Sequence, residues 1–147
     1  MMSRDPTPDE PFDIGSDLRL VLGRLVRRVR EETLCDHLTW PQMRVLARID
    51  REGPATVTVL AKFAGVRPQS MGATIADLVA ADHLVTETDP DDRRAVRVSL
   101  TDKGHAAVDA IRSARADWLN RTIRDRLLPR EQARLREAVS LLQRLVN

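Results

Sequence analysis

Several residue types are scarce in this chain, and each scarcity narrows what the protein can be. The 147 residues include no tyrosine, and aromatic residues make up only 3% of them. The single cysteine, Cys35, cannot form a disulfide within the chain. No stretch approaches the ~20 apolar residues of a membrane span, and the N-terminus has no apolar run typical of a signal peptide. We therefore expect a cytoplasmic protein without a membrane partner.

The sequence also lacks the motifs of common enzyme classes. It has no glycine-rich phosphate loop, no nucleophile elbow and no side-chain spacing that predicts a metal site. Cys35, Asp36 and His37 are adjacent, but consecutive side chains point in different directions, so they do not predict a metal site either. The histidines are scattered and form no identifiable acid–base pair with the cysteine. We therefore expect no enzyme, no cofactor and no metal.

The residues that are abundant favour a mainly helical protein. Hydrophobic residues make up 42% of the chain and charged residues 31%. Because aromatic residues are scarce, the core must consist mostly of Leu, Val, Ile and Ala, as is typical of helical proteins. The formal net charge is only +2, so any surface that binds nucleic acid must be a local concentration of positive charge. Nearly all basic residues are arginine, which suits phosphate contacts but also results from a GC-rich genome.

Residues 56–100 contain the pattern around which the chain is organised. We predict a helix over residues 57–64, a turn at Gly65, a second helix over residues 68–81 and a two-stranded antiparallel ribbon over residues 84–100. Together these elements make a winged helix-turn-helix. The second helix of such a motif fits the major groove of DNA, and the ribbon can reach the neighbouring minor groove.

The candidate DNA contacts lie on the second of these helices and on the ribbon. The outer side of the helix is short and polar, as a groove-facing surface should be. The predicted contacts at this helix are Arg67, Pro68, Gln69, Ser70, Ala73 and Thr74. The predicted contacts on the ribbon are Asp92, Arg93, Arg94 and Arg97. Alternatively, the arginines at the tip are solvated charges and Ser70 only satisfies the helix N-terminus.

The helices outside this pattern carry long apolar stripes. We predict them over residues 16–34, over residues 102–126 and from residue 129 onward. A small winged lobe cannot cover all of these stripes, so a core shared with a second subunit is favoured over an intramolecular bundle. The predicted dimer-interface residues are Leu18, Leu22, Val108, Ile111, Trp118, Leu135, Leu142 and Leu145.

The chain therefore divides into a tail, a dimerisation region and a DNA-binding lobe. Residues 1–13, which are rich in proline and acidic residues, are expected to be disordered. Residues 14–36 and 102–147 form the predicted helical dimerisation region, and residues 37–101 form the predicted winged helix-turn-helix lobe.

Capping residues indicate where two further helices begin. Thr39 followed by Gln42 fits a capping box at the start of the lobe's first helix. Ser16 or Asp17 can cap the helix that precedes it.

A candidate ligand pocket lies where these two helices meet. His37, Trp40 and Met43 either line a pocket there or pack tightly as core, and the sequence leaves both interpretations open. Cys35 lies beside them and raises the hypothesis of a thiol-based redox sensor. Because the chain has no second cysteine to resolve an oxidised thiol, a plain, partly buried cysteine is the simpler interpretation.

Several runs of residues match a known family. The run DPDDRRAVRVSLTDKG at residues 89–104 combines an Asp-x-Arg hairpin with Leu-Thr and a following helix. Leu60-Ala61 and the run RPQSM at residues 67–71 fit the same pattern. In these motifs, and in the order of its predicted helices, the chain resembles the MarR family of winged helix-turn-helix regulators.

The resemblance implies a sequence-specific transcriptional regulator that binds double-stranded DNA. It implies a repressor that acts as a homodimer with interlocked terminal helices on a pseudo-palindromic operator. It further implies that Arg94 inserts into the minor groove, with Asp92 holding it. A small lipophilic or phenolic inducer would release the DNA by binding between the dimer helices and the lobe. The alternatives are a helical protein-interaction module without specific DNA binding and a redox-sensing regulator that acts through Cys35.

The chain departs from the family pattern at several positions. The family usually ends its recognition helix with Gly, where this chain has Asp82-His83, and it usually has Ser or Thr where this chain has Leu128. Gly72 lies inside the predicted recognition helix, at a cost of up to ~1 kcal/mol relative to Ala. Its missing side chain would permit close approach to the DNA backbone.

Overall fold

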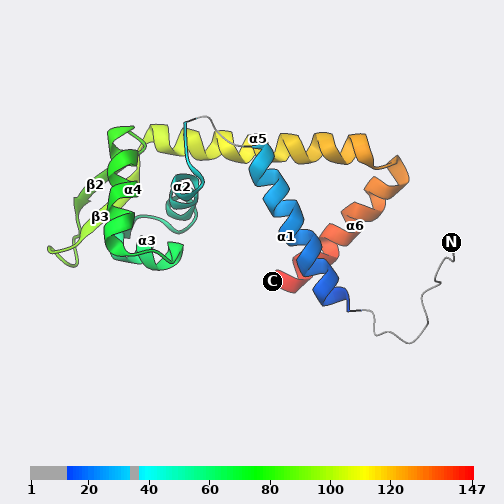
Figure 1. Cartoon of the computed structure of the whole chain (residues 1–147), viewed down its shortest axis with the longest axis horizontal. Coiled ribbons are helices and arrows are strands. Elements are labelled where there is room, and N and C mark those ends of the chain that lie inside the picture. The colour runs from blue at the N-terminus through cyan, green and yellow to red at the C-terminus, as the bar shows by residue number, and fades with distance from the viewer. Residues whose placement is uncertain (1–12, 34–36) are drawn as a thin grey trace, which may run out of the picture.

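The computed structural model describes residues 13–33 and 37–147, which form two regions joined by one long helix (Figure 1). The winged lobe comprises residues 37–112, and the helical arm comprises residues 13–33 and 113–147. The predicted tail, apart from Asp13, and Cys35 lie outside the described residues. The elements in chain order are α1 Ile14–Glu32, α2 Trp40–Glu52, β1 Ala55–Thr56, α3 Val57–Ala64, α4 Pro68–Ala80, β2 Leu84–Thr88, β3 Val96–Leu100, α5 Asp102–Arg126 and α6 Pro129–Val146.

The helices of the winged lobe begin and end where local chemistry predicts. Thr39 and Gln42 form the predicted capping box of α2, which ends at Gly53. The hydroxyl of Thr56 accepts the N–H of Val59 to cap α3. Gly65 ends α3 with a φ of 69°, a left-handed conformation that glycine adopts without steric cost. The helix-turn-helix predicted from the sequence is therefore confirmed.

The wing is a three-stranded antiparallel sheet in the order β1-β3-β2. The predicted ribbon is β2 paired with β3, with Thr86 opposite Val98 and Thr88 opposite Val96. The prediction of two strands missed β1, in which Ala55 pairs with Val98 on the other side of β3. A strand of only two residues is too short to show the alternation from which strands are predicted.

Among the described residues, every buried hydrophobic side chain lies within the winged lobe. Its most deeply buried side chains come from α2, α3, α4 and β3: Leu46, Leu60, Leu78 and Val98. The first half of α5 closes this core, because Val108 is 5% exposed and belongs to the same cluster. Ile111, one turn further along, is 6% exposed. Our prediction that Val108 and Ile111 belong to a dimer interface was therefore wrong, since the subunit's own lobe covers both side chains.

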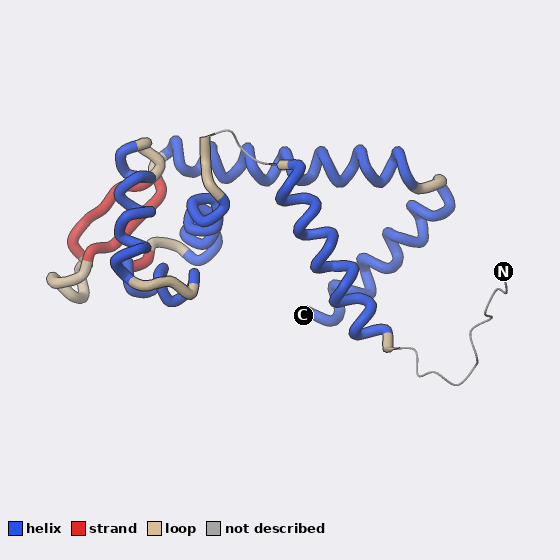
Figure 2. The backbone as a smooth tube through the Cα atoms, viewed as in Figure 1, coloured by secondary structure: helices blue, strands red, loops and turns tan. Residues whose placement is uncertain are grey.

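The helical arm has the opposite character. Figure 2 shows α1 and α6 running away from opposite ends of the second half of α5, and each of them contacts α5. Every residue of α1 and α6 is described, and none of these residues is buried. None of the described helices is long and apolar enough to cross a membrane. Of the predicted dimer residues, Leu18, Leu22, Trp118, Leu135, Leu142 and Leu145 all lie in this arm, half-buried or exposed.

The N-terminus of α1 is capped by a residue that the sequence did not indicate. The carboxylate of Asp13 accepts both the backbone N–H and the hydroxyl of Ser16. These hydrogen bonds from Ser16 hold the pKa of Asp13 below its usual value. The prediction of Ser16 or Asp17 as the cap was wrong because α1 begins two residues earlier, at Ile14.

A cluster of charged side chains fastens the winged lobe's α2 to α5. Arg112 Nη2 donates to Asp50 Oδ2 at 2.9 Å, and His105 Nδ1 lies 3.2 Å from Asp50 Oδ1. The hydrogen bond from Arg112 holds the pKa of the Asp50 carboxyl below its usual value, and the contact with His105 adds to this effect. These contacts and the burial of Val108 make the first half of α5 part of the lobe.

Candidate nucleic-acid interface

The recognition helix α4 presents one apolar side to the lobe and one polar side to solvent. Met71, Ile75 and Leu78 are buried against the core. The predicted contacts Arg67, Pro68, Gln69, Ser70 and Ala73 are exposed, whereas Thr74 is half-buried. The Thr74 hydroxyl donates to the carbonyl of Ser70 at 3.3 Å, so it is engaged within its own helix. The structure therefore gathers these predicted contacts at the exposed, N-terminal part of α4.

The shape of the wing tip is set by hydrogen bonds in which backbone N–H groups donate to a carboxylate and to backbone carbonyls. Asp89 Oδ1 accepts the N–H groups of Asp91 and Asp92 at 2.8 and 3.1 Å. The N–H of Ala95 donates to the carbonyl of Asp92, and the carbonyl of Ala95 accepts the N–H of Asp89. Such side-chain-to-backbone bonds fix the path of a turn. The tip therefore has a defined shape even though its residues are exposed or half-buried.

Asp92 and Arg94 are connected through the main chain. Asp92 Oδ1 accepts the backbone N–H of Arg94 at 2.9 Å. Among the described residues, no ion pair joins the two side chains, so the Arg94 guanidinium is left exposed to solvent. Asp92 thus holds the backbone at Arg94 without pairing with its guanidinium.

The four predicted wing residues do not all lie together. Asp92, Arg93 and Arg94 share the tip, where they are exposed. Arg97 lies within β3, opposite Glu87 on β2 and Thr56 on β1, and it is half-buried. The tip and the N-terminal part of α4 extend from the same lobe, and α4 packs against β2 (Figure 1).

The three candidate ligand residues are not brought into one pocket. Trp40 lines a cavity of about 280 Å³ with Arg30, Arg115 and apolar residues of α1 and α5. Met43 is buried and lines a separate cavity of about 120 Å³ beside Val108 and Ile111. His37 is exposed and lines neither cavity.

The Trp40 cavity combines apolar walls with positive charge. The guanidinium carbons of Arg30 and Arg115 lie 4.9 and 5.5 Å from the centroid of the indole ring. Such contacts hold cations against an aromatic face. Leu25, Val26, Val29 and Leu119 supply the remaining walls. The sequence did not identify Arg30 or Arg115, because they are far apart in the chain and neither belongs to a motif.

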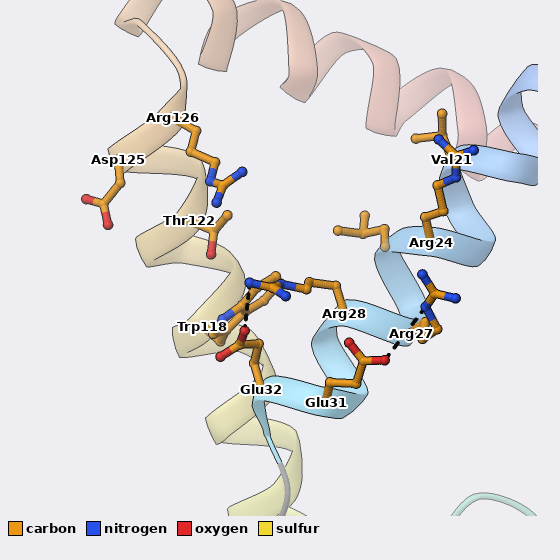
Figure 3. A pocket seen from close by; sticks show the side chains of 11 residues that line it. Val21, Arg24, Arg27, Arg28, Glu31, Glu32, Trp118, Thr122, Asp125 and Arg126 are labelled. Atoms are coloured by element: carbon orange, nitrogen blue, oxygen red, sulfur yellow. Dashed lines mark ion pairs between the residues drawn. The ribbon is translucent and has the colours of Figure 1, made fainter.

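A larger open groove of about 810 Å³ separates α1 from the second half of α5 (Figure 3). Trp118 and Arg126 of α5 line it opposite the charged side of α1. Most of its α1 charges pair within their own helix, as in the Arg28–Glu32 ion pair at 2.9 Å. Trp118 is therefore part of an unfilled groove rather than of a packed core.

The structure offers no metal site within residues 13–33 and 37–147, where no group of three or more His, Cys, Asp or Glu side chains could hold an ion. The hypotheses that involve Cys35 and Asp36 lie outside the described residues and stay untested.

Comparison with known proteins places this geometry in a family. The family model described as MarR family matches residues 38–95, which span most of the winged lobe. An HTH-type transcriptional regulator of Mycobacterium tuberculosis is 33% identical over 139 residues, which cover 95% of this chain and 96% of the relative. The HTH-type transcriptional repressor NicR of Pseudomonas putida is 28% identical over 113 residues, covering 74% of this chain and 72% of the repressor.

A solved structure supports the same assignment at the level of the fold. The crystal structure of a transcriptional regulator from Thermotoga maritima superposes with a TM-score of 0.79 at 23% identity, covering 88% of this chain and 94% of that protein. The sequence match over nearly the whole chain and the exposed recognition helix beside a built wing agree with each other. The chain belongs to the MarR family of helix-turn-helix transcriptional regulators.

Proposed function

We propose that the protein is a sequence-specific DNA-binding repressor. The observation that carries this proposal is the hydrogen-bonded wing tip, which leaves Arg94 exposed on the same lobe that carries the exposed part of α4. An arginine in this position suits the negative potential of a narrow minor groove. Gln69 and Ser70 on α4 are side chains that can read base edges in the adjacent major groove. The related protein NicR is a repressor, which favours repression over activation.

The repressor acts as a homodimer on a pseudo-palindromic operator. The unburied apolar side chains of α1 and α6, which include Leu22, Leu141 and Leu145, need a surface to cover them. A second copy of the same helices provides such a surface, and a two-fold dimer presents two recognition helices to two half-sites.

A small phenolic or lipophilic ligand releases the DNA by binding beside Trp40. The cavity lies between α1 and α5 of the arm and the first residue of α2, so an occupant contacts both regions of the protein. Its apolar walls suit an aromatic ring, and the guanidiniums of Arg30 and Arg115 suit an acidic hydroxyl. A ligand that binds one orientation of the lobe relative to the arm more tightly than another raises the population of that orientation. The proposed ligand favours an orientation that does not fit the DNA.

Binding to duplex DNA across a salt series tests the proposal. Duplexes selected by the purified protein from a random-sequence pool serve as the specific probe, and scrambled duplexes serve as the competitor. We expect Arg94→Ala to weaken specific binding by about 1–3 kcal/mol. Arg121→Ala removes the same charge from an exposed position on the arm and serves as the control.

The alternative function, a helical interaction module, makes a different prediction. A protein of that kind selects no duplex from the pool and shows no salt-dependent binding. If Arg94→Ala and Arg121→Ala have the same small effect, the proposed role of the wing is wrong.

A further inference from the structure

The turn that follows the recognition helix is bound to the first turn of α5. Thr101, the N-cap of α5, donates its hydroxyl to the carbonyl of Asp82 at 2.6 Å and its N–H to the carbonyl of His83 at 3.2 Å. The same hydroxyl accepts the N–H of Gly104 at 3.0 Å, which caps α5. One side chain therefore joins the C-terminal end of α4 to the N-terminal end of α5.

Lys103 makes a second connection between the two helices. Its Nζ donates to the carbonyl of Ala81, the C-cap residue of α4, at 2.7 Å. The last carbonyls of a helix have no partner within the helix, and they carry the negative end of its dipole. A lysine from α5 supplies both the missing donor and the complementary charge.

Gly104 brings the two backbones into direct contact. A Cβ at this position would lie 2.1 Å from the carbonyl oxygen of His83, which is too close for any side chain. Asp82, in the same turn, has a φ of 63°, a left-handed conformation that costs a non-glycine residue about 1 kcal/mol. The contacts with α5 hold the turn in this conformation.

We propose that Thr101, Lys103 and Gly104 are positioning residues that fix the orientation of the recognition helix relative to α5. This inference rests on the proposed DNA-binding function. The predicted base contacts of Gln69 and Ser70 require well-aligned hydrogen bonds to base edges. A small rotation of α4 therefore removes them, whereas the phosphate contacts of flexible, positively charged side chains tolerate it.

Two substitutions each remove one side-chain link of this connection and leave the buried residues of the lobe unchanged. Thr101→Val keeps the shape of the side chain and loses its hydrogen bonds, whereas Thr101→Ser keeps the hydroxyl. Lys103→Met keeps the aliphatic stem of an exposed side chain and loses its donor. Lys62→Met removes the same charge from the other lysine of the chain, which is exposed on α3, and is the matched control.

The decisive readout is the ratio of affinities for a selected duplex and for a scrambled duplex. The selected duplex is obtained by enrichment on the wild-type protein from a random-sequence pool. We expect Thr101→Val and Lys103→Met to lower this ratio about tenfold, as the loss of one base contact does. Thr101→Ser restores the wild-type ratio, and Lys62→Met changes both affinities equally. The salt dependence of non-specific binding is the same for Lys103→Met as for the wild-type protein, because Lys103 bonds a carbonyl rather than a phosphate.

Other outcomes overturn the inference in recognisable ways. If the substitutions lower thermal stability while the ratio is unchanged, the contacts stabilise the fold and do not position α4. If Thr101→Val fails to fold, Lys103→Met decides the question alone, since its side chain is exposed. If the wild-type protein enriches no duplex, the proposed DNA-binding function fails, and the inference fails with it.

Discussion

The winged lobe and the helical arm are built from similar residues, but only the lobe completes a core. Leu60 of the lobe is 0% exposed, whereas Leu145 of the arm is 74% exposed. Both belong to amphipathic helices, and both are spaced as core residues are. The difference is that the lobe's helices pack on one another and on a sheet, whereas α1 and α6 each contact mainly α5. An apolar stripe therefore predicts that one side of a helix is covered, but it does not predict whether the same subunit or another molecule covers it.

The same difference extends along α5 itself. Its first half carries Val108 and Ile111, which are buried by the winged lobe, and its second half carries Trp118, which lines an open groove. The lobe is therefore complete within one subunit, whereas the apolar side chains of α1 and α6 are left without a cover in the subunit alone.

The largest change in unfolding free energy is expected when one leucine of each region is replaced by alanine. Leu60→Ala leaves a cavity in a packed core and should lower the free energy of unfolding by about 2–5 kcal/mol at every protein concentration. Leu145→Ala should have little effect at low concentration, where the subunit is alone, and a growing effect as dimers form. Urea denaturation over a hundredfold concentration range measures both. A Leu145→Ala cost that is independent of concentration would show that the arm is covered within the subunit.

A smaller effect is expected at the wing. Asp92→Ala removes the acceptor that holds the N–H of Arg94, and it also removes a negative charge that repels phosphate. If Asp92 directs Arg94, specific binding weakens by about 1 kcal/mol, the value of one hydrogen bond, despite the more favourable charge. Equilibrium binding to selected and scrambled duplexes distinguishes the two effects. Tighter binding to both would mean that Asp92 acts only through its charge.

The sequence predicted local structure well because the signals for it are local. The bounds of α3 match the prediction, since Thr56 caps the helix and Gly65 supplies the left-handed residue that ends it. The wing followed from the alternation in β3 and from the turn-forming aspartates at its tip. The assignment to the MarR family, inferred from residues 60–104, is likewise confirmed by the family match.

The sequence failed where the answer depends on residues that are distant in the chain. Periodicity identified Val108 as apolar but could not show that the lobe, rather than a second subunit, covers it. His37, Trp40 and Met43 are close in sequence, yet only Trp40 reaches the cavity formed with Arg30 and Arg115. The DNA contacts stay predictions, because the structure shows where their side chains lie and not what they bind.

Two helix-interior glycines, one in each region, allow a finer comparison. A Cβ at Gly72 of α4 or at Gly23 of α1 would have no described heavy atom within 4 Å. Each Gly→Ala change should therefore raise the unfolding free energy of the isolated subunit by about 0.5–1 kcal/mol. We expect the gain to persist at high protein concentration for Gly72→Ala. For Gly23→Ala it should disappear in the proposed dimer, because an added methyl group beside the exposed Leu22 would disturb the packing of a second subunit on α1.

Thermal unfolding at low and high concentration measures these gains. Gly53→Ala is the negative control, which should lower the unfolding free energy instead of raising it. Gly53 has a φ of 86°, which alanine rarely adopts. Equal gains for Gly23→Ala at all concentrations would place α1 at that position outside any subunit contact.

The smallest effect is expected from the ionic contact between α2 and α5, where the two regions meet. Arg112 lowers the pKa of Asp50 in the folded state. The contact therefore stabilises the fold fully at pH values above 3.8, the ordinary pKa of Asp, and this stabilisation is lost as the pH falls through the lower pKa of the folded state. Asp50→Asn should therefore cost up to about 1 kcal/mol at pH 7, the usual limit for a partly exposed ion pair, and progressively less as the pH falls below 3.8. Parallel urea titrations of the two proteins across the acidic range measure the difference, in which the titration of groups that do not contact Asp50 cancels. If the difference between the two proteins does not change with pH, the charge of Asp50 is not what holds α5. Asp50 would then act through its hydrogen bonds, which the Asn side chain reproduces only in part.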